Sequence, residues 1–232
     1  MALRTTKTSL MLAMKVWDRS TRLFHWLTLA CMVTSYVSIS LADGANAAVW
    51  MRVHVVSGET MLGLLIYRLI WGVIGSETAR FGSFLRNPVV ALRSLAKWRE
   101  TSGDVEVGHN PPGGWMVVLL LGLLLAQVGT GLFANDDGAT KGPLMRFVSK
   151  STSDMLSDLH GAIFNVLMGA AAVHVVAITL YLVVKHQNLI TPMVTGKKRL
   201  PAAMPAPRLA SPLAAIGTLL VAVVVTLAVA LL

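Results

Sequence analysis

The chain has 232 residues, of which 55% are hydrophobic and only 13% are charged, and its formal net charge at pH 7 is +9. These values lie far from those of soluble domains and identify a membrane protein. The positive charge requires no nucleic-acid partner, because loops that face an anionic lipid leaflet account for it. The only cysteine is Cys31, which excludes a disulfide within the chain, a CxxC metal pair and the CxxCH motif of covalently attached haem.

The first 22 residues are interpreted as a cytoplasmic N-terminal tail. A signal peptide is the alternative, because the apolar run SLMLAM follows Arg4 and Lys7. That run has only six residues, and no small-residue cleavage site precedes Trp17, so we favour the tail.

Five apolar segments are long enough to cross a bilayer core of about 30 Å. They cover residues 23–41, 53–74, 114–132, 159–184 and 213–232. We predict an all-α membrane protein, in which a four-helix transmembrane bundle over residues 23–184 precedes a C-terminal fifth transmembrane helix. The bundle contains the long loops 75–113 and 133–158, and residues 185–212 form a linker rich in Pro and Ala.

The distribution of Lys and Arg predicts the orientation of these spans. Fifteen of the 20 Lys and Arg residues lie in the tail, in loop 75–113 and in the segment after the fourth span, against four in the other two loops. By the positive-inside rule the N-terminus and linker 185–212 are cytoplasmic, and loop 133–158 is periplasmic. We therefore expect a multi-pass protein of the bacterial inner membrane.

Two connecting segments have patterns of their own. In loop 75–113, apolar residues recur at helical spacing beside basic residues, which predicts an amphipathic helix at the membrane surface. The apolar residues are Leu85, Val89, Leu92, Leu95 and Ala96, and the basic ones are Arg86, Arg93 and Lys97. The linker sequence RLPAAMPAPRLASP has four prolines and is too broken to be helical.

Four of the six histidines lie inside predicted spans, where an ionisable side chain indicates a functional site. His25 begins the first span on the cytoplasmic side, and His54 begins the second on the periplasmic side. His160 and His174 lie fourteen residues apart on the fourth span, on nearly the same helix face and about 21 Å apart along the axis. These depths pair His25 with His174 and His54 with His160.

Two histidine pairs at two depths of a four-helix bundle are what two b-type haems require. Small residues on the fourth span leave room for a porphyrin: Gly161, Ala162, Gly169, Ala170, Ala171 and Ala172. A structural zinc needs four ligands around one point, which histidines at two depths cannot supply. The other histidines, His109 and His186, are interpreted as solvated or interfacial residues.

Three arginines are candidates to pair with haem propionates near the membrane faces. Arg22 lies one turn before His25, and Arg52 lies just outside His54. Arg68 shares the helix face of His54 but lies at the cytoplasmic depth, where a propionate of the cytoplasmic haem is the candidate partner. The alternative for Arg68 is an extended side chain that reaches the lipid headgroups without a specific partner.

Several segments resemble the bacterial cytochrome b561 family, which includes the cytochrome b subunits of nickel-iron hydrogenases. They are VWDRSTRLFHW, HVVSGETMLGLLIYRLIWGVIGSETARFGSF, GHNPPGGWMVVLLL, QVGTGLFANDD and NLITPMVTGKK. The resemblance implies four transmembrane helices that carry two b haems, with His25, His54, His160 and His174 as axial ligands. It also implies a propionate role for Arg22, Arg68 and Arg80. The fifth span departs from the family pattern.

The function expected from these features is transmembrane electron transfer between the quinone pool and a redox partner, which we expect to be periplasmic. A c-type cytochrome or a hydrogenase is such a partner. The fifth span has no ionisable residue, and we expect it to serve as a lipid anchor or as an oligomer contact. No residue indicates acid-base or nucleophilic catalysis, and the chemistry belongs to the cofactors. Two alternatives stay open: an enzyme that oxidises quinol with oxygen or superoxide, and a transport or assembly protein without redox activity.

Overall fold

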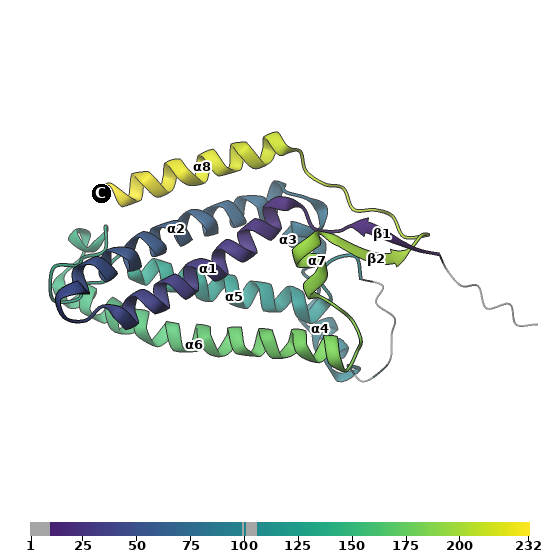
Figure 1. Ribbon diagram of the computed structural model, residues 1–232, viewed down its shortest axis with the longest axis horizontal. Coiled ribbons are helices and arrows are strands. Elements are labelled where there is room, and N and C mark those ends of the chain that lie inside the picture. The colour runs from purple at the N-terminus through teal and green to yellow at the C-terminus, as the bar shows by residue number, and fades with distance from the viewer. Residues whose placement is uncertain (1–9, 99, 101–105) are drawn as a thin grey trace, which may run out of the picture.

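The computed structural model describes residues 10–98, 100 and 106–232. Arg4, Lys7 and Arg99, which the orientation count includes, lie outside this part of the chain. Five long helices dominate the fold (Figure 1). They are α1 (Arg19–Leu41), α2 (Ala47–Ile74), α5 (Pro111–Gly131), α6 (Lys150–Val183) and α8 (Pro212–Ala230). Each is long and apolar enough to cross a membrane, which confirms the number of predicted spans within the described residues. Helices α2 and α6 begin before the predicted starts at residues 53 and 159, so residues 150–158 of the predicted loop 133–158 belong to α6.

Polar residues at the helix starts explain where four of these helices begin. Asp18 accepts a hydrogen bond from the Thr21 amide and caps α1, and Asn110 caps α5 in the same way. Ser149 and Ser211 cap α6 and α8. Such caps satisfy backbone N–H groups that have no partner within the helix. Helices α5 and α8 also begin with proline, which lacks the N–H that would go unpaired.

The first four long helices form the bundle, and α8 lies along its outer side (Figure 1). Helix α1 packs on α2, α5 packs on α6, and α2 also contacts α5. The central cluster of buried side chains comprises Met61, Leu65, Leu121, Leu124, Val128 and Leu167, from α2, α5 and α6. At the level of the bilayer core such a cluster stabilises the bundle through van der Waals packing between the helices.

Helix α8 packs against the outer face of α2 in the same chain. Ala222 of α8 is 1% exposed and packs with Tyr67 and Trp71. Where the two helices cross, a Cβ added at Gly63 would lie 2.9 Å from Thr226 Oγ1. The fifth helix therefore has one face on the bundle and one apolar face outside it.

Shorter elements connect the long helices. They are the 3₁₀ helices η1 (Gly44–Asn46), η2 (Glu77–Ala79) and η3 (Met145–Phe147) and the α-helices α3 (Phe81–Phe84), α4 (Pro88–Ala96) and α7 (Ile190–Thr195). Helix α4 falls within the predicted amphipathic segment. Its Ala91 is buried, whereas Val89, Leu92 and Leu95 are exposed. This is the arrangement of a helix that presents an apolar face to lipid.

A two-stranded antiparallel sheet joins the N-terminal tail to the linker. Strand β1 (Met11–Lys15) pairs with β2 (Lys197–Pro201), with Met11 opposite Pro201 and Lys15 opposite Lys197. The adjoining Val16 and Leu200 are both fully buried. The described part of the tail is therefore fixed on the bundle. The predicted linker contains α7 and β2, while residues 202–211 are non-helical, as the prolines predicted.

Candidate functional site

The four membrane histidines occupy two ends of the bundle. His54 on α2 and His160 on α6 lie at the end opposite the sheet, which we call the His54–His160 end. His25 on α1 and His174 on α6 lie toward the sheet, at the His25–His174 end. This placement follows from the antiparallel course of the helices and agrees with the pairing by depth.

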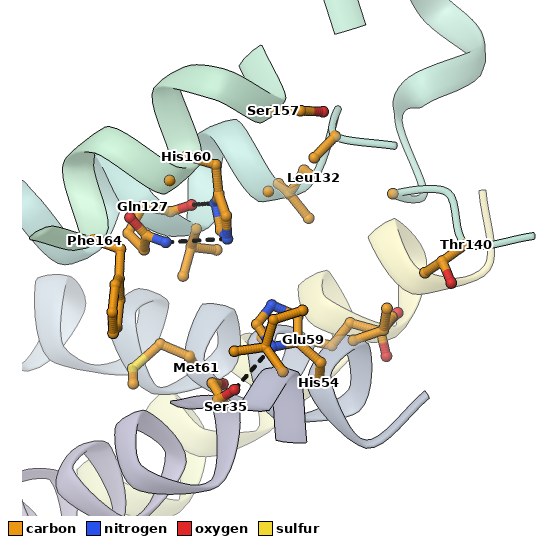
Figure 2. Close-up of a pocket in the computed structure, with 18 of the residues that line it drawn as sticks. Ser35, His54, Glu59, Met61, Gln127, Leu132, Thr140, Ser157, His160 and Phe164 are labelled. Atoms are coloured by element: carbon orange, nitrogen blue, oxygen red, sulfur yellow. Dashed lines mark hydrogen bonds between the residues drawn. The ribbon is translucent and has the colours of Figure 1, made fainter. Parts of the chain in front are cut away.

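At the His54–His160 end the two imidazole rings face each other across a cavity (Figure 2). Their centroids are 6.2 Å apart, and their planes are inclined at 80°. The cavity has a volume of about 380 Å³ and is lined by residues of α1, α2, α5, α6 and the loop after α5. Most of its lining is apolar, as is usual for a cofactor site.

Each of these rings is oriented by a backbone carbonyl of the neighbouring helix. His54 Nδ1 lies 3.1 Å from the Ser35 carbonyl oxygen of α1, and His160 Nδ1 lies 2.8 Å from the Gln127 carbonyl oxygen of α5. A carbonyl can only accept a hydrogen bond, so Nδ1 carries the proton and Nε2 carries the lone pair in both rings. This tautomer is the one in which Nε2 can bind a metal.

The Gln127 side chain also contacts His160. Its amide Nε2 lies 3.0 Å from His160 Nε2, and its Oε1 is buried without a hydrogen-bond partner among the described residues. Gln127 therefore reaches both ring nitrogens of one histidine, one through its backbone and one through its side chain. The sequence analysis assigned no role to Gln127, although a polar residue inside a predicted span is a signal of function.

Glu59 is a second residue that the sequence analysis missed. It lies within the predicted span 53–74 and lines the same cavity as His54 and His160 (Figure 2). A carboxyl group inside a span is itself a candidate functional group. A charged residue inside the predicted span 53–74 is the sequence signal that could have identified Glu59.

The His25–His174 end differs from the other end in the polar contacts of its residues. The buried Nδ1 atom of His25 has no hydrogen-bond partner in the described part of the chain. Two residues close to His25 on α1 donate hydrogen bonds to backbone carbonyls of α7. Arg22 donates hydrogen bonds to the Asp18 and Val194 carbonyl oxygens, and Trp26 donates from Nε1 to the Met193 carbonyl oxygen at 3.1 Å.

Arg68 is buried at this end and does not extend to the surface. Its side chain is 3% exposed, and its guanidinium carbon lies 4.8 Å from the Phe81 ring centroid and 6.0 Å from that of Phe24. Such cation–π contacts stabilise a desolvated cation. Nη1 nevertheless has no hydrogen-bond partner among the residues described. The interpretation of Arg68 as a residue that reaches the headgroups is wrong.

The other three candidate arginines differ from Arg68. Arg22 is engaged with backbone carbonyls of α1 and α7. Arg80 is exposed and donates from Nε to the Gly75 carbonyl oxygen at 2.7 Å. Arg52 is exposed on the first turns of α2, within electrostatic range of Glu59. Of the four, Arg68 is the buried one with an unsatisfied donor.

His109 contradicts its interpretation as a solvated residue. Its ring packs against Trp17 and Phe84 at centroid distances of 4.8 and 4.7 Å, and its Nδ1 is buried. Burial, together with smaller contributions from the nearby charges of Arg68 and His174, lowers the pKa of His109 to about 3. His109 is thus a neutral third histidine beside the His25–His174 end. His186, in contrast, is exposed, as predicted.

These features define an all-helical, multi-pass membrane protein with histidine pairs at both ends of a four-helix bundle. The family described as prokaryotic cytochrome b561 matches residues 16–196. The chain belongs to this family, and membership implies transmembrane electron transfer with b-type haem. No curated protein and no solved structure matches the chain significantly.

Proposed function

We propose that the chain is a membrane electron-transfer subunit that holds two b-type haems, one at His54 and His160 and one at His25 and His174. It connects the quinone pool to a redox partner on the periplasmic side. The geometry of His54 and His160 is the observation that carries this proposal.

The distance between these rings fits ligation of one iron by both. Bonds from imidazole nitrogen to a metal are about 2.0–2.1 Å long, so two rings on one ion have centroids about 6 Å apart. The observed separation is 6.2 Å. With Nδ1 of each ring held by a carbonyl, Nε2 is the atom that would bind the iron.

At the other end the unsatisfied polar atoms favour a cofactor with carboxylate groups. His25 Nδ1 and Arg68 Nη1 are buried without partners among the described residues. A propionate would satisfy the Arg68 guanidinium, while His25 and His174 would be the axial ligands. A bound haem supplies the one-electron chemistry of its iron, and the chain supplies ligands, charge and exclusion of water.

The proposal places the N-terminus in the cytoplasm and the protein in the bacterial inner membrane. The basis is the excess of Lys and Arg in the tail, loop 75–113 and the segment after α6. Loop 133–158 is then periplasmic and would meet a partner such as a c-type cytochrome or a hydrogenase. The outer face of α8, with exposed Leu213, Leu220 and Val224, would meet lipid or another subunit.

A self-sufficient enzyme that uses oxygen or superoxide is the second candidate, and it would need a free cationic pocket on the periplasmic side. Two of the three cations of loop 133–158 are already engaged. Lys150 pairs with Asp137 and Asp154, and the Arg146 guanidinium lies 4.8 Å from the Phe147 ring centroid. These contacts favour the electron-transfer subunit.

The test measures the haem-to-protein ratio and the reduced-minus-oxidised absorbance spectrum of the purified chain. We expect two b-type haems per chain, and one in the variant His160→Ala. The matched control is His186→Ala, which removes an exposed histidine and should keep both. A chain that binds no haem would refute the proposal, and a full complement in His160→Ala would refute the ligand assignment.

Partner identity needs a separate experiment. Co-purification from membranes in mild detergent, with subunits identified by mass, should recover a periplasmic or membrane-bound redox protein. Recovery of the chain alone, with quinol oxidation by oxygen or superoxide at a high rate, would favour the self-sufficient enzyme.

A further inference from the structure

Gly131, the last residue of α5, lies directly against the ring of His160. A Cβ added to Gly131 would be 2.8 Å from His160 Cε1 and 3.1 Å from Nδ1. Both distances are shorter than ordinary van der Waals contacts, so an alanine here would require the ring or the helix to move.

The His160 ring cannot move away from Gly131 and keep its present orientation. The same side of the ring donates from Nδ1 to the Gln127 carbonyl oxygen at 2.8 Å, and Thr130 Oγ1 lies 3.3 Å from that nitrogen. Gln127, Thr130 and Gly131 all belong to the last turns of α5. The end of α5 therefore makes both the hydrogen bond to His160 Nδ1 and the close contact at Gly131. If the His160 ring moved away to make room for a Cβ at Gly131, its hydrogen bond to the Gln127 carbonyl would lengthen.

Backbone conformation does not explain the glycine. The glycines with positive φ among the described residues are Gly44 and Gly196, so Gly131 adopts a conformation open to any residue. Gly129, one position before Thr130, has nothing within 4 Å of an added Cβ. Gly131 differs from Gly129 because an added Cβ at Gly131 would collide with the His160 ring.

We propose that Gly131 is a positioning residue for His160. By bringing the α5 backbone against the ring, it lets the Gln127 carbonyl fix the Nδ1–H tautomer and directs Nε2 toward His54. The consequence for haem rests on the proposed function, whereas the steric relation between Gly131 and His160 does not. The competing explanation is that Gly131 only allows α5 and α6 to pack closely, as small residues do in membrane bundles.

The first experiment compares Gly131→Ala with Gly129→Ala, two identical substitutions near the end of one helix. Residues that orient a metal ligand typically contribute 10–100-fold to metal affinity. We expect Gly131→Ala to reduce haem affinity at the His54–His160 end by about 10–100-fold. Any haem retained there should show a changed midpoint potential and a changed low-spin electron paramagnetic resonance signal. Gly129→Ala should leave haem content, potentials and spectra unchanged, and the haem at the other end should be unchanged in both variants.

The second experiment separates positioning from helix packing and remains decisive if Gly131→Ala is poorly folded. Thermal unfolding is measured for Gly131→Ala alone, His160→Ala alone and the double variant. We expect Gly131→Ala to lower the melting temperature when His160 is present and to leave it unchanged or raised in the His160→Ala background, since alanine favours helix. An equal loss in both backgrounds would show a packing glycine and overturn the proposal, as would equal behaviour of Gly131→Ala and Gly129→Ala. If the unmutated chain holds no haem at this end, the proposed function fails, while the unfolding comparison still decides the role of Gly131.

Discussion

The two ends of the bundle position their histidines by different means. At the His54–His160 end, both rings are oriented by backbone carbonyls of adjacent helices, and the surrounding lining is mostly apolar. At the His25–His174 end, His25 Nδ1 has no partner among the described residues, and a buried arginine lies among aromatic rings. One end fixes ligand orientation, and the other supplies charge. The comparison indicates that substitutions at each end should change different properties.

The largest expected effect is loss of one whole haem. Because the proposed ligands are paired by position, His25→Ala and His174→Ala should both empty the site at the His25–His174 end and leave the site at the His54–His160 end filled. His54→Ala should do the reverse, as His160→Ala does. Haem-to-protein ratios and redox titrations of the single variants would check this. If His25→Ala and His54→Ala removed the same haem, the pairing and the topology would both be wrong.

Removal of the fifth helix is expected to have the next largest effect, on stability. Deletion of residues 212–232 exposes Tyr67 and Trp71, which are buried in the cluster that includes Ala222. We expect a lower melting temperature, because the van der Waals packing of α8 on α2 is lost, with both haems retained. Thermal unfolding in one detergent, together with haem content, measures this. Haem loss from an inserted, truncated chain would place α8 within the cofactor-binding bundle.

Arg68 provides a test of the charged end alone. A cation stabilises the reduced haem more than the oxidised haem, because reduction adds negative charge. Arg68→Leu should therefore lower the midpoint potential of the haem at the His25–His174 end, on the order of tens of millivolts, where about 59 mV corresponds to a tenfold change in a one-electron equilibrium. The midpoint potential of the haem at the His54–His160 end should stay nearly constant. Arg68→Lys, which keeps the charge, is the matched control, and equal shifts at both ends would contradict a local contact.

The last prediction concerns pH and His109. Its folded-state pKa is about 3, below the ordinary value of about 6.5, so the unfolded chain binds the extra proton between these values. Stability should therefore fall as pH decreases from about 6.5 toward 3, by up to about 1.4 kcal/mol per pH unit. His109→Phe should show a shallower decrease between pH 7 and 5 in thermal unfolding. His186→Ala is the control, and identical slopes for the unmutated chain and His109→Phe would contradict a buried neutral imidazole.

The spans and the location of the histidines could be predicted from sequence because both depend on local patterns. Apolar segments of bilayer length predict helices, and the spacing of His160 and His174 along one helix determines their relative depth. The sequence is compatible both with burial of Arg68 and with its extension to the surface, because the contacts with Phe24 and Phe81 come from other elements.

Contacts between distant segments explain what the sequence did not reveal. No turn signal links β1 to β2, because their pairing is made by tertiary structure. Helix α8 is apolar on every side, so its sequence cannot show which face packs on α2. His109 lies in a polar loop sequence, and only the approach of Trp17 and Phe84 removes it from water. Gly131 similarly gains its importance from the position of His160 on another helix.

The small sheet has a consequence for how the chain is made. Strand β1 ends at Lys15 and β2 begins at Lys197, so the pair encloses the family-matched residues 16–196. During synthesis β1 leaves the ribosome first and must wait until four helices have been inserted before its partner strand emerges. Closure of the sheet is therefore a late event in biogenesis, and it completes the His25–His174 end of the bundle only after α6, which carries His174, has been synthesised.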